Sequence, residues 1–298
     1  MGLGPSPAAF WSGGDIEAMA RGGDMRKRVI RFVSVGLAVA AAWLPARAAD
    51  LVIPGSGDCE AVLAGLAVAF EKAHPGRKVG VPASTGSTGG VQAVQKNEAV
   101  LARIARPLKP DEAKSGLKAV VFGRDAIVFA IGGKVAVSSL TAVQFADVFS
   151  GRVTNWRDLG GEPAPIRLVV REESDSTILL LRARLEPFRT LRMGETAKMV
   201  TRTQDMLDML ARYKTAIGWA THSAVQAAGA GVRALALDGV SPTEATVASG
   251  QYPVAIEYAL VFKDERLTAE AREFLAFVGT APVGAVLRRL GVSPVTRN

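Results

Sequence analysis

The stretch from residue 50 to residue 73 reads DLVIPGSGDCEAVLAGLAVAFEKA and places a strand, a turn and a helix in that order. Residues 50–54 form a short apolar run typical of a buried strand, and apolar residues recur at helical spacing over 60–73. The junction between them, residues 55–59, is made of small and polar residues. A helix start has unpaired backbone N–H groups and the positive end of the helix dipole, so this junction is a candidate anion cradle.

Two more junctions follow the same plan. Residues 84–90 read STGSTGG and lie between a predicted strand at 78–81 and a helix that we expect from about 91 to 99. Residues 171–177 read REESDST and separate a predicted strand at 166–170 from a helix at 176–185. Each junction alone could be a plain helix cap or a turn, and an Arg at a strand end could be a surface residue. Three together indicate a shared site.

The whole pattern predicts an α/β protein. The chain has 298 residues, 49% hydrophobic and 21% charged, which is the composition of a globular protein. Strands alternate with helices, so we expect a mostly parallel sheet. Apolar runs at 119–122 and 126–131 predict a pair of long strands that cross between two lobes. The other predicted elements are helices at 140–149, 269–278 and 283–290 and strands at 216–220 and 252–262.

The N-terminal region has the order of a secretory signal. A basic start at 25–28 precedes an apolar run at 29–44 and a small-residue cleavage site at 45–49. We expect cleavage after Ala48 or Ala49 and a periplasmic mature protein, with a retained membrane anchor as the alternative. Residues 1–24 are interpreted as an upstream extension, so residues 1–48 do not belong to the folded protein.

The sequence offers little for chemistry. Cys59 is the single cysteine and cannot pair within the chain, and the two histidines, His74 and His222, are too few for a typical transition-metal site. We therefore expect no catalytic residue, no metal and no cofactor. Scattered basic residues and three tyrosines argue against nucleic-acid binding. The formal net charge of +8 could steer an anion, or it could reflect a basic solvated surface.

Longer motifs resemble a known family over residues 51–296. The motifs are LTAVQFADVFSGRVTNW at 140–156, LGG at 159–161, IGW at 217–219, GQYP at 250–253, FL at 274–275 and Gly291. In order and spacing they are similar to the phosphate-binding proteins of bacterial ABC importers, in the type II periplasmic binding-protein superfamily.

The resemblance implies two lobes with a ligand cleft between them. Residues 49–128 and 240–298 would form lobe I, and residues 129–239 would form lobe II. Such a protein closes on phosphate or a related tetrahedral oxyanion and delivers it to the membrane permease of an ABC transporter. We expect it to be a monomer. The alternative is an oxyanion sensor or an adhesion module on the same fold without a transport role.

The resemblance also implies which residues hold the ligand. The first junction supplies Gly57, Asp58 and Cys59, the second Ser87 and the neighbouring Thr88, and the third Arg171 and Thr177. Two positions depart from the family pattern. Ala105 stands where the family has an acidic residue before Arg106, and Asp175-Ser176 replaces Ser-Gly.

The missing acid bears on specificity. In the family that carboxylate accepts the proton of monohydrogen phosphate, which fully deprotonated sulfate does not have. Our hypothesis is that Asp175 takes over this role while Arg106 adds positive charge. The alternative is that Asp175 only caps the helix that begins at Ser176 and points away from the ligand.

Overall fold

The computed structural model describes residues 51–295. The predicted upstream extension and signal peptide, residues 1–48, lie outside the described residues. Within 51–295, no helix has the length and apolar character needed to cross a membrane.

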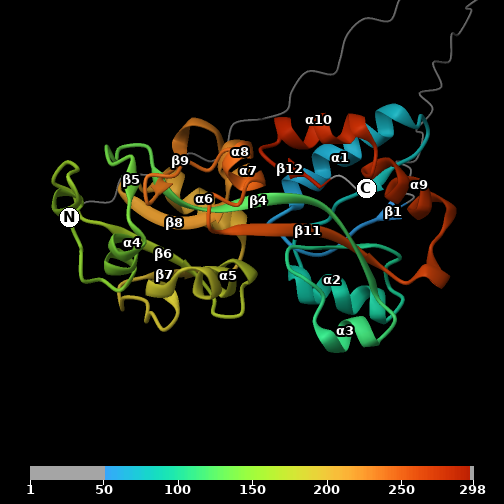
Figure 1. Ribbon diagram of the computed structural model, residues 1–298, viewed down its shortest axis with the longest axis horizontal. Helices are drawn as coiled ribbons and strands as arrows, with labels where there is room; N and C mark the ends of the chain where they lie inside the picture. Colours follow the sequence, from blue (N-terminus) through green and yellow to red (C-terminus); the bar gives the residue numbers. More distant parts are fainter. Residues whose placement is uncertain (1–50, 296–298) are drawn as a thin grey trace, which may run out of the picture. The chain divides into compact units, whose positions relative to one another are not determined.

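The longest element is strand β4, Lys118–Gly132, which runs through the middle of Figure 1. Its first half pairs with β11 (Ala255–Phe262) and its second half with β8 (Ala216–Thr221). The prediction of two strands here was wrong, because the polar residues at its centre have partners. Arg124 pairs with Glu257 on β11, with nitrogen and oxygen 2.9 Å apart, so the strand continues without a turn.

The large sheet is mixed, with the order β3-β11-β4-β8-β6-β7. Three neighbouring pairs are antiparallel: β3 (Ala102–Ile104) with β11, β11 with β4, and β4 with β8. Strand β6 (Arg167–Arg171) pairs in parallel with β8 on one side and with β7 (Lys198–Val200) on the other. The expected mostly parallel sheet was therefore wrong. The reason is that β11 brings the chain back along β4, and a strand that returns beside another runs antiparallel to it.

Helices gather at both ends of β4. In Figure 1, α1 (Glu60–Ala73), α2 (Gly86–Gln95), α3 (Pro110–Lys114), α9 (Ala269–Val278) and α10 (Ala281–Arg289) lie toward one end. Toward the other lie α4 (Ala142–Phe149), α5 (Ser176–Arg184) and α6 (Thr203–Arg212). The remaining elements are α7 (His222–Ala228), α8 (Glu244–Ala248), β1 (Leu51–Val52), β2 (Val79–Gly80), β5 (Ser139–Leu140), β9 (Val232–Ala234), β10 (Ala236–Leu237), β12 (Ser293–Pro294) and four short 3-10 turns.

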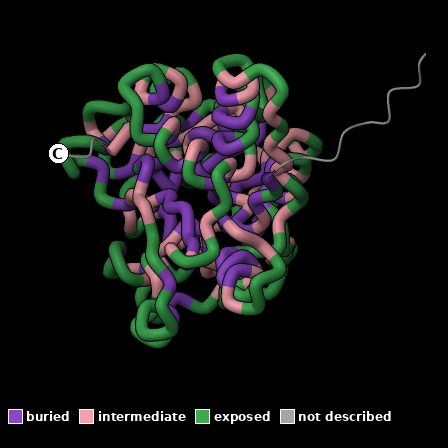
Figure 2. The backbone as a smooth tube through the Cα atoms, turned by 90° about the vertical axis from the view of Figure 1, so that its right-hand side faces the viewer, coloured by how far each residue is buried: buried purple, intermediate pink, exposed green. Residues whose placement is uncertain are grey.

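Each end has its own group of aromatic side chains in the core. Phe129 stacks on Phe145 with ring centroids 3.7 Å apart, and Phe70 meets Phe274 edge-on at 5.1 Å. These rings are 0–1% exposed, and burying such a ring stabilises the fold by about 2 kcal/mol. Figure 2 shows the buried segments inside and the exposed ones around them. Each end of β4 therefore has a packed aromatic core of its own.

Several predicted bounds were right and several were not. The helices at 60–73 and 269–278 are confirmed, whereas α2 begins at Gly86 and not near residue 91. The sequence did not predict α6 or α7. In α6 the buried residues Met206, Leu207 and Leu210 do follow a helical spacing, so the signal was present.

Candidate functional site

The first two junctions pack together because glycines allow a very close approach. Gly55 has a positive φ of +138°, and a Cβ there would lie 1.9 Å from the carbonyl oxygen of Arg103. A Cβ on Gly90, in α2, would lie 2.8 Å from the Cα of Gly55. Any larger side chain would push the loop before α1 away from α2 and β3.

Arg103 holds the same two loops from beneath. It is fully buried, and its guanidinium donates to the carbonyl oxygens of Ser56 at 2.8 Å and Pro82 at 2.7 Å. The guanidinium also donates to the carbonyl oxygen of Ile53. It forms an ion pair with Glu60, with nitrogen and carboxylate oxygen 3.2 Å apart. The sequence analysis missed Arg103, although an Arg between apolar residues of a buried strand is a usable signal.

Four helix N-termini surround one cavity of about 650 Å³. Its lining comes from the loop before α1, the start of α2, the start of α5 and the segment before α6. The residues used below are Ser56, Gly57, Asp58, Ser87, Thr88, Arg106, Arg171, Asp175, Ser176, Thr201 and Arg202. The structure thus brings the three predicted junctions together and adds a fourth, at 201–203.

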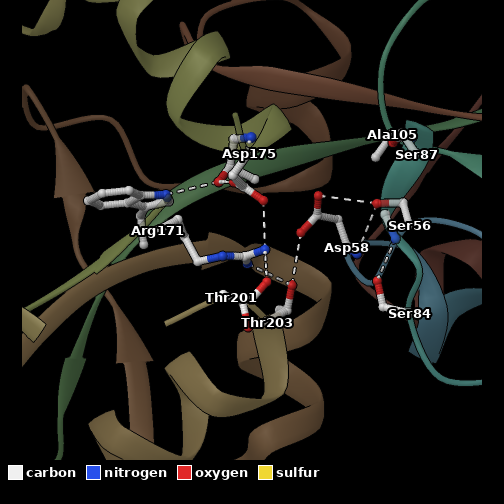
Figure 3. A network of polar contacts seen from close by, with 12 residues as sticks. Ser56, Asp58, Ser84, Ser87, Ala105, Arg171, Asp175, Thr201 and Thr203 are labelled. Atoms are coloured by element: carbon white, nitrogen blue, oxygen red, sulfur yellow. Dashed lines mark hydrogen bonds and ion pairs between the residues drawn. The ribbon is translucent and has the colours of Figure 1, made fainter. Parts of the chain in front are cut away.

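Arg171 provides the buried positive charge of this cavity (Figure 3). Its side chain is 8% exposed. One terminal nitrogen donates to Asp175 Oδ2 at 2.6 Å and to the carbonyl oxygen of Thr201 at 3.0 Å, and the other donates to Thr203 Oγ1 at 3.1 Å. Its buried Nε has no hydrogen-bond partner among the described residues.

Asp175 both caps α5 and pairs with Arg171. Its Oδ1 accepts from the backbone N–H of Thr177 at 3.0 Å and also from the Thr177 hydroxyl, while Oδ2 accepts from Arg171. Asp175 therefore does cap α5, as the alternative from the sequence analysis proposed. Its carboxylate nevertheless points at Arg171 and not away from the cavity (Figure 3). Both of its oxygens are engaged within the chain.

Asp58 is a further carboxyl group of the cavity. It is 5% exposed, its Oδ1 accepts from Thr203 Oγ1 at 2.9 Å, and its Oδ2 accepts from Ser56 Oγ at 3.3 Å. Burial raises the pKa of Asp58 to about 6, the negative charge of Asp175 adds to the rise, and Arg171 opposes it. Thr203 thus bridges Asp58 and Arg171. The sequence analysis missed Thr203, whose signal is a hydroxyl residue directly before the apolar pattern of α6.

Two predicted ligand residues do not line the cavity. Cys59 is fully buried in the core, its Sγ lies 3.8 Å from the Ser56 carbonyl oxygen, and burial raises the pKa of its thiol to about 12. Thr177 is 1% exposed, and its hydroxyl accepts from Trp219 Nε1 at 2.9 Å. Their side chains are directed into the core and not toward this cavity, so only their backbone groups stay predicted ligand contacts.

The remaining predicted residues lie at the cavity. Ser87 Oγ accepts from the backbone N–H of Ala105 at 3.1 Å, and Thr88 lines the cavity beside it. Arg106 also lines the cavity, but both of its terminal nitrogens bind Glu112 at 2.7 Å. Much of its charge is therefore compensated locally.

Tyr258 and the buried carboxyl group of Asp125 lie beneath the first loop. Tyr258 Oη is 2.9 Å from the Asp58 carbonyl oxygen and 2.8 Å from Asp125 Oδ2, and one phenolic proton serves one acceptor at a time. A protonated Asp125 satisfies both contacts, because it donates to Tyr258 while Tyr258 donates to Asp58. Burial raises the pKa of Asp125 to about 7, which agrees with this arrangement.

Comparisons with known proteins agree with the fold and with one another. A family model described as "PBP superfamily domain" matches residues 40–281. The phosphate-binding protein PstS of Bacillus subtilis is 28% identical over 260 residues, covering 83% of this chain and 81% of that protein. PstS of Borreliella burgdorferi is 22% identical over 232 residues, covering 76% and 83%.

One solved structure is similar to this chain over nearly the full length of the solved chain. It is a putative phosphate ABC transporter substrate-binding protein with bound phosphate from Clostridium perfringens, with a TM-score of 0.75 and 26% identity, covering 83% of this chain and 99% of that one. With the family match over residues 40–281, the chain belongs to the PBP superfamily and has its two-lobed type II fold.

Proposed function

We propose that this protein is an extracytoplasmic solute-binding protein that captures phosphate or a related tetrahedral oxyanion and delivers it to the permease of an ABC transporter. Two relatives are named phosphate-binding proteins, and the similar solved structure is of a putative phosphate ABC transporter substrate-binding protein with bound phosphate. We propose binding and no catalytic step. The signal peptide, the periplasmic location and the monomeric state predicted from the sequence are part of the same proposal.

One observation carries the proposal: the buried Arg171 lies in a cavity bordered by four helix N-termini. Helix N-termini present N–H groups and positive potential, and a guanidinium can donate two parallel hydrogen bonds to an oxyanion. The combination favours a compact anion over a neutral solute. The ligand contacts that we propose come from Gly57, Asp58, Ser87, Thr88, Arg106, Arg171, Asp175 and Ser176.

Closure of two lobes would hold the ligand. We propose lobe I as residues 49–128 and 240–298 and lobe II as residues 129–239. The bond from Thr203 to Asp58 would then connect the lobes, and so would an anion placed between Ser87 and Arg171. A ligand that bridges both lobes stabilises the closed state and shifts the equilibrium toward it.

Titration calorimetry on the purified protein tests this function with phosphate, sulfate, molybdate and arsenate. Saturable phosphate binding at one site is expected. If none of the four anions binds, the sensor or adhesion alternative replaces the proposal. Turnover of a phosphate ester would contradict the absence of a catalytic step. The transport role requires slower phosphate uptake by cells that lack the gene, with recovery on its return.

A further inference from the structure

Helix α5 has apolar residues on two opposite faces. Ile178 and Leu181 are fully buried in the core, whereas Leu179 leaves 51% of its surface exposed. A surface helix normally turns polar residues toward water, with one apolar stripe toward the core. The second apolar face of α5 therefore requires an explanation outside the core packing.

That second face forms a wall of a cavity of about 680 Å³. Ser176, Leu179, Leu180 and Ala183 line it, and this spacing of three and four residues is one side of a helix. From Ser176 to Ala183 the helix rises by about 10 Å. The cavity thus starts at the N-terminus of α5 and follows the helix axis.

The second cavity is continuous with the anion cleft. Arg106, Ser176 and Leu179 line both. Ala105 lies at the wall of the second cavity, so the position where the family has an acidic side chain has only a methyl group here. A group bound at the start of α5 can therefore extend past Ala105 without meeting a carboxylate at that position.

The opposite wall is also mostly apolar. It is formed by Pro253, Ala255 and Ile256, around the start of β11. Arg184 and the ion pair of Arg124 with Glu257 lie at the cavity as well. Organic ligands bind in pockets of roughly 300–1,000 Å³ with apolar walls and a few polar groups. The second cavity matches that description, whereas a bare tetrahedral anion is served by the first cavity alone.

We propose that the ligand is an organic phosphoryl compound, a phosphate monoester or a phosphonate. Its phosphoryl group lies beside Arg171 at the N-terminus of α5, and its organic group lies along Leu179, Leu180 and Ala183. This inference rests on the oxyanion-binding function proposed above and specifies the ligand class of the same cleft.

The test compares three probes by titration calorimetry: inorganic phosphate, methylphosphonate and phenylphosphonate. Phenylphosphonate is expected to bind at least about tenfold more tightly than methylphosphonate, because its ring removes the apolar walls from water. The protein is used as the purified chain, and its melting temperature is recorded for each variant.

Ala183→Trp fills the second cavity from an exposed helical position that does not line the anion cleft. It is expected to lower phenylphosphonate affinity at least tenfold and to leave phosphate affinity within about twofold. The matched control is Ala285→Trp, an exposed alanine on α10 outside both cavities. It should change neither affinity.

Three results overturn the inference. The first is phosphate binding without a preference for phenylphosphonate, which leaves the proposed function intact. The second is an equal loss of all three ligands in Ala183→Trp, which would mean that the opposite lobe covers this face on closure. The third is no binding of any probe, which rejects the proposed function as well. A selective loss of phenylphosphonate supports the inference.

Discussion

The two sides of the anion cleft are held in place by different means. On one side the loop at 55–59 is held by backbone packing. Gly55 packs directly against the carbonyl oxygen of Arg103, and the guanidinium of Arg103 donates to the carbonyl oxygen of Ser56 in that loop. On the other side Arg171 is held by side chains, above all by the ion pair with Asp175 at 2.6 Å. The packed loop presents the same backbone N–H donors with or without a ligand. In the ion pair, a bound anion can replace the Asp175 carboxylate as the partner of Arg171.

This difference separates shape from charge. The first loop fixes where an anion fits, and Arg171 fixes how strongly it is attracted. Asp58 and Asp175 both interact with this buried guanidinium, so its charge is partly compensated within the site. The four substitutions below test each side in turn.

The largest effect is expected for Arg171→Ala. Phosphate affinity should fall at least a hundredfold, because a buried charged donor is lost and two carboxyl groups remain without their cation. Titration calorimetry measures the change. The matched control is Arg202→Ala, which removes an exposed cavity arginine that is already paired with Asp205 and should cost about threefold or less. Equal losses in the two variants would contradict the assignment of Arg171.

Gly55→Ala tests the side held by backbone packing. The added methyl would overlap the Arg103 carbonyl, so the free energy of unfolding should fall by about 3 kcal/mol. Urea unfolding gives the value. Gly86→Ala is the control, because Gly86 also has a positive φ, +73°, but has open space around a Cβ. It should cost only about 1 kcal/mol. If both variants lose the same amount, backbone conformation matters and close packing does not.

Asp125→Asn tests the protonation of Asp125 under the first loop. The pKa of Asp125 is raised from 3.8 to about 7, so the folded state binds the proton more tightly than the unfolded state. Its contribution to stability is full below pH 4 and is lost as the pH rises through 7. Asn keeps the hydrogen bonds of the protonated acid, so the variant should be more stable than wild type by about 2 kcal/mol at pH 8.

The same pair of proteins should differ little at pH 4. At the lower pH the carboxyl group of wild-type Asp125 is protonated and makes the same hydrogen bonds as Asn. Thermal unfolding of both proteins at the two pH values measures the difference. A constant difference at both values would mean that Asp125 does not titrate in the folded state near pH 7.

The smallest effect concerns anion choice. If Asp175 accepts a ligand proton, Asp175→Asn should lower the preference for phosphate over sulfate by about tenfold. Asn can still cap α5, so the fold should be retained. Because both Asp175 oxygens are already engaged, Asp58→Asn is measured beside it. An unchanged preference in Asp175→Asn together with a loss in Asp58→Asn would transfer the role to Asp58.

Much of the local structure follows from short-range patterns. The helices at 60–73 and 269–278 have apolar residues at helical spacing and polar starts, and both were predicted with their bounds. The three junctions were recognisable for the same reason. Helix α6 was missed, and with it Thr203, because its first turn is strongly polar.

The continuous β4 was not predictable from local pattern. Gly123, Arg124 and Asp125 look like a break, and they become part of a strand only because β11 and α7 supply partners. The core positions of Cys59 and Thr177 likewise depend on distant segments, as the contact of Thr177 with Trp219 shows.

The sequence by itself determined the α/β class, the family resemblance and the three helix-start junctions, since these depend on neighbouring residues and on the order of motifs. Tertiary structure decided that four helix starts meet in one cavity, that Asp175 pairs with Arg171 and that α5 leaves an apolar face beside Ala105. Such pairings join residues far apart in the chain: Thr203 and Asp58 are 145 positions apart. No local pattern encodes a contact of that range, because it depends on how the whole sheet packs.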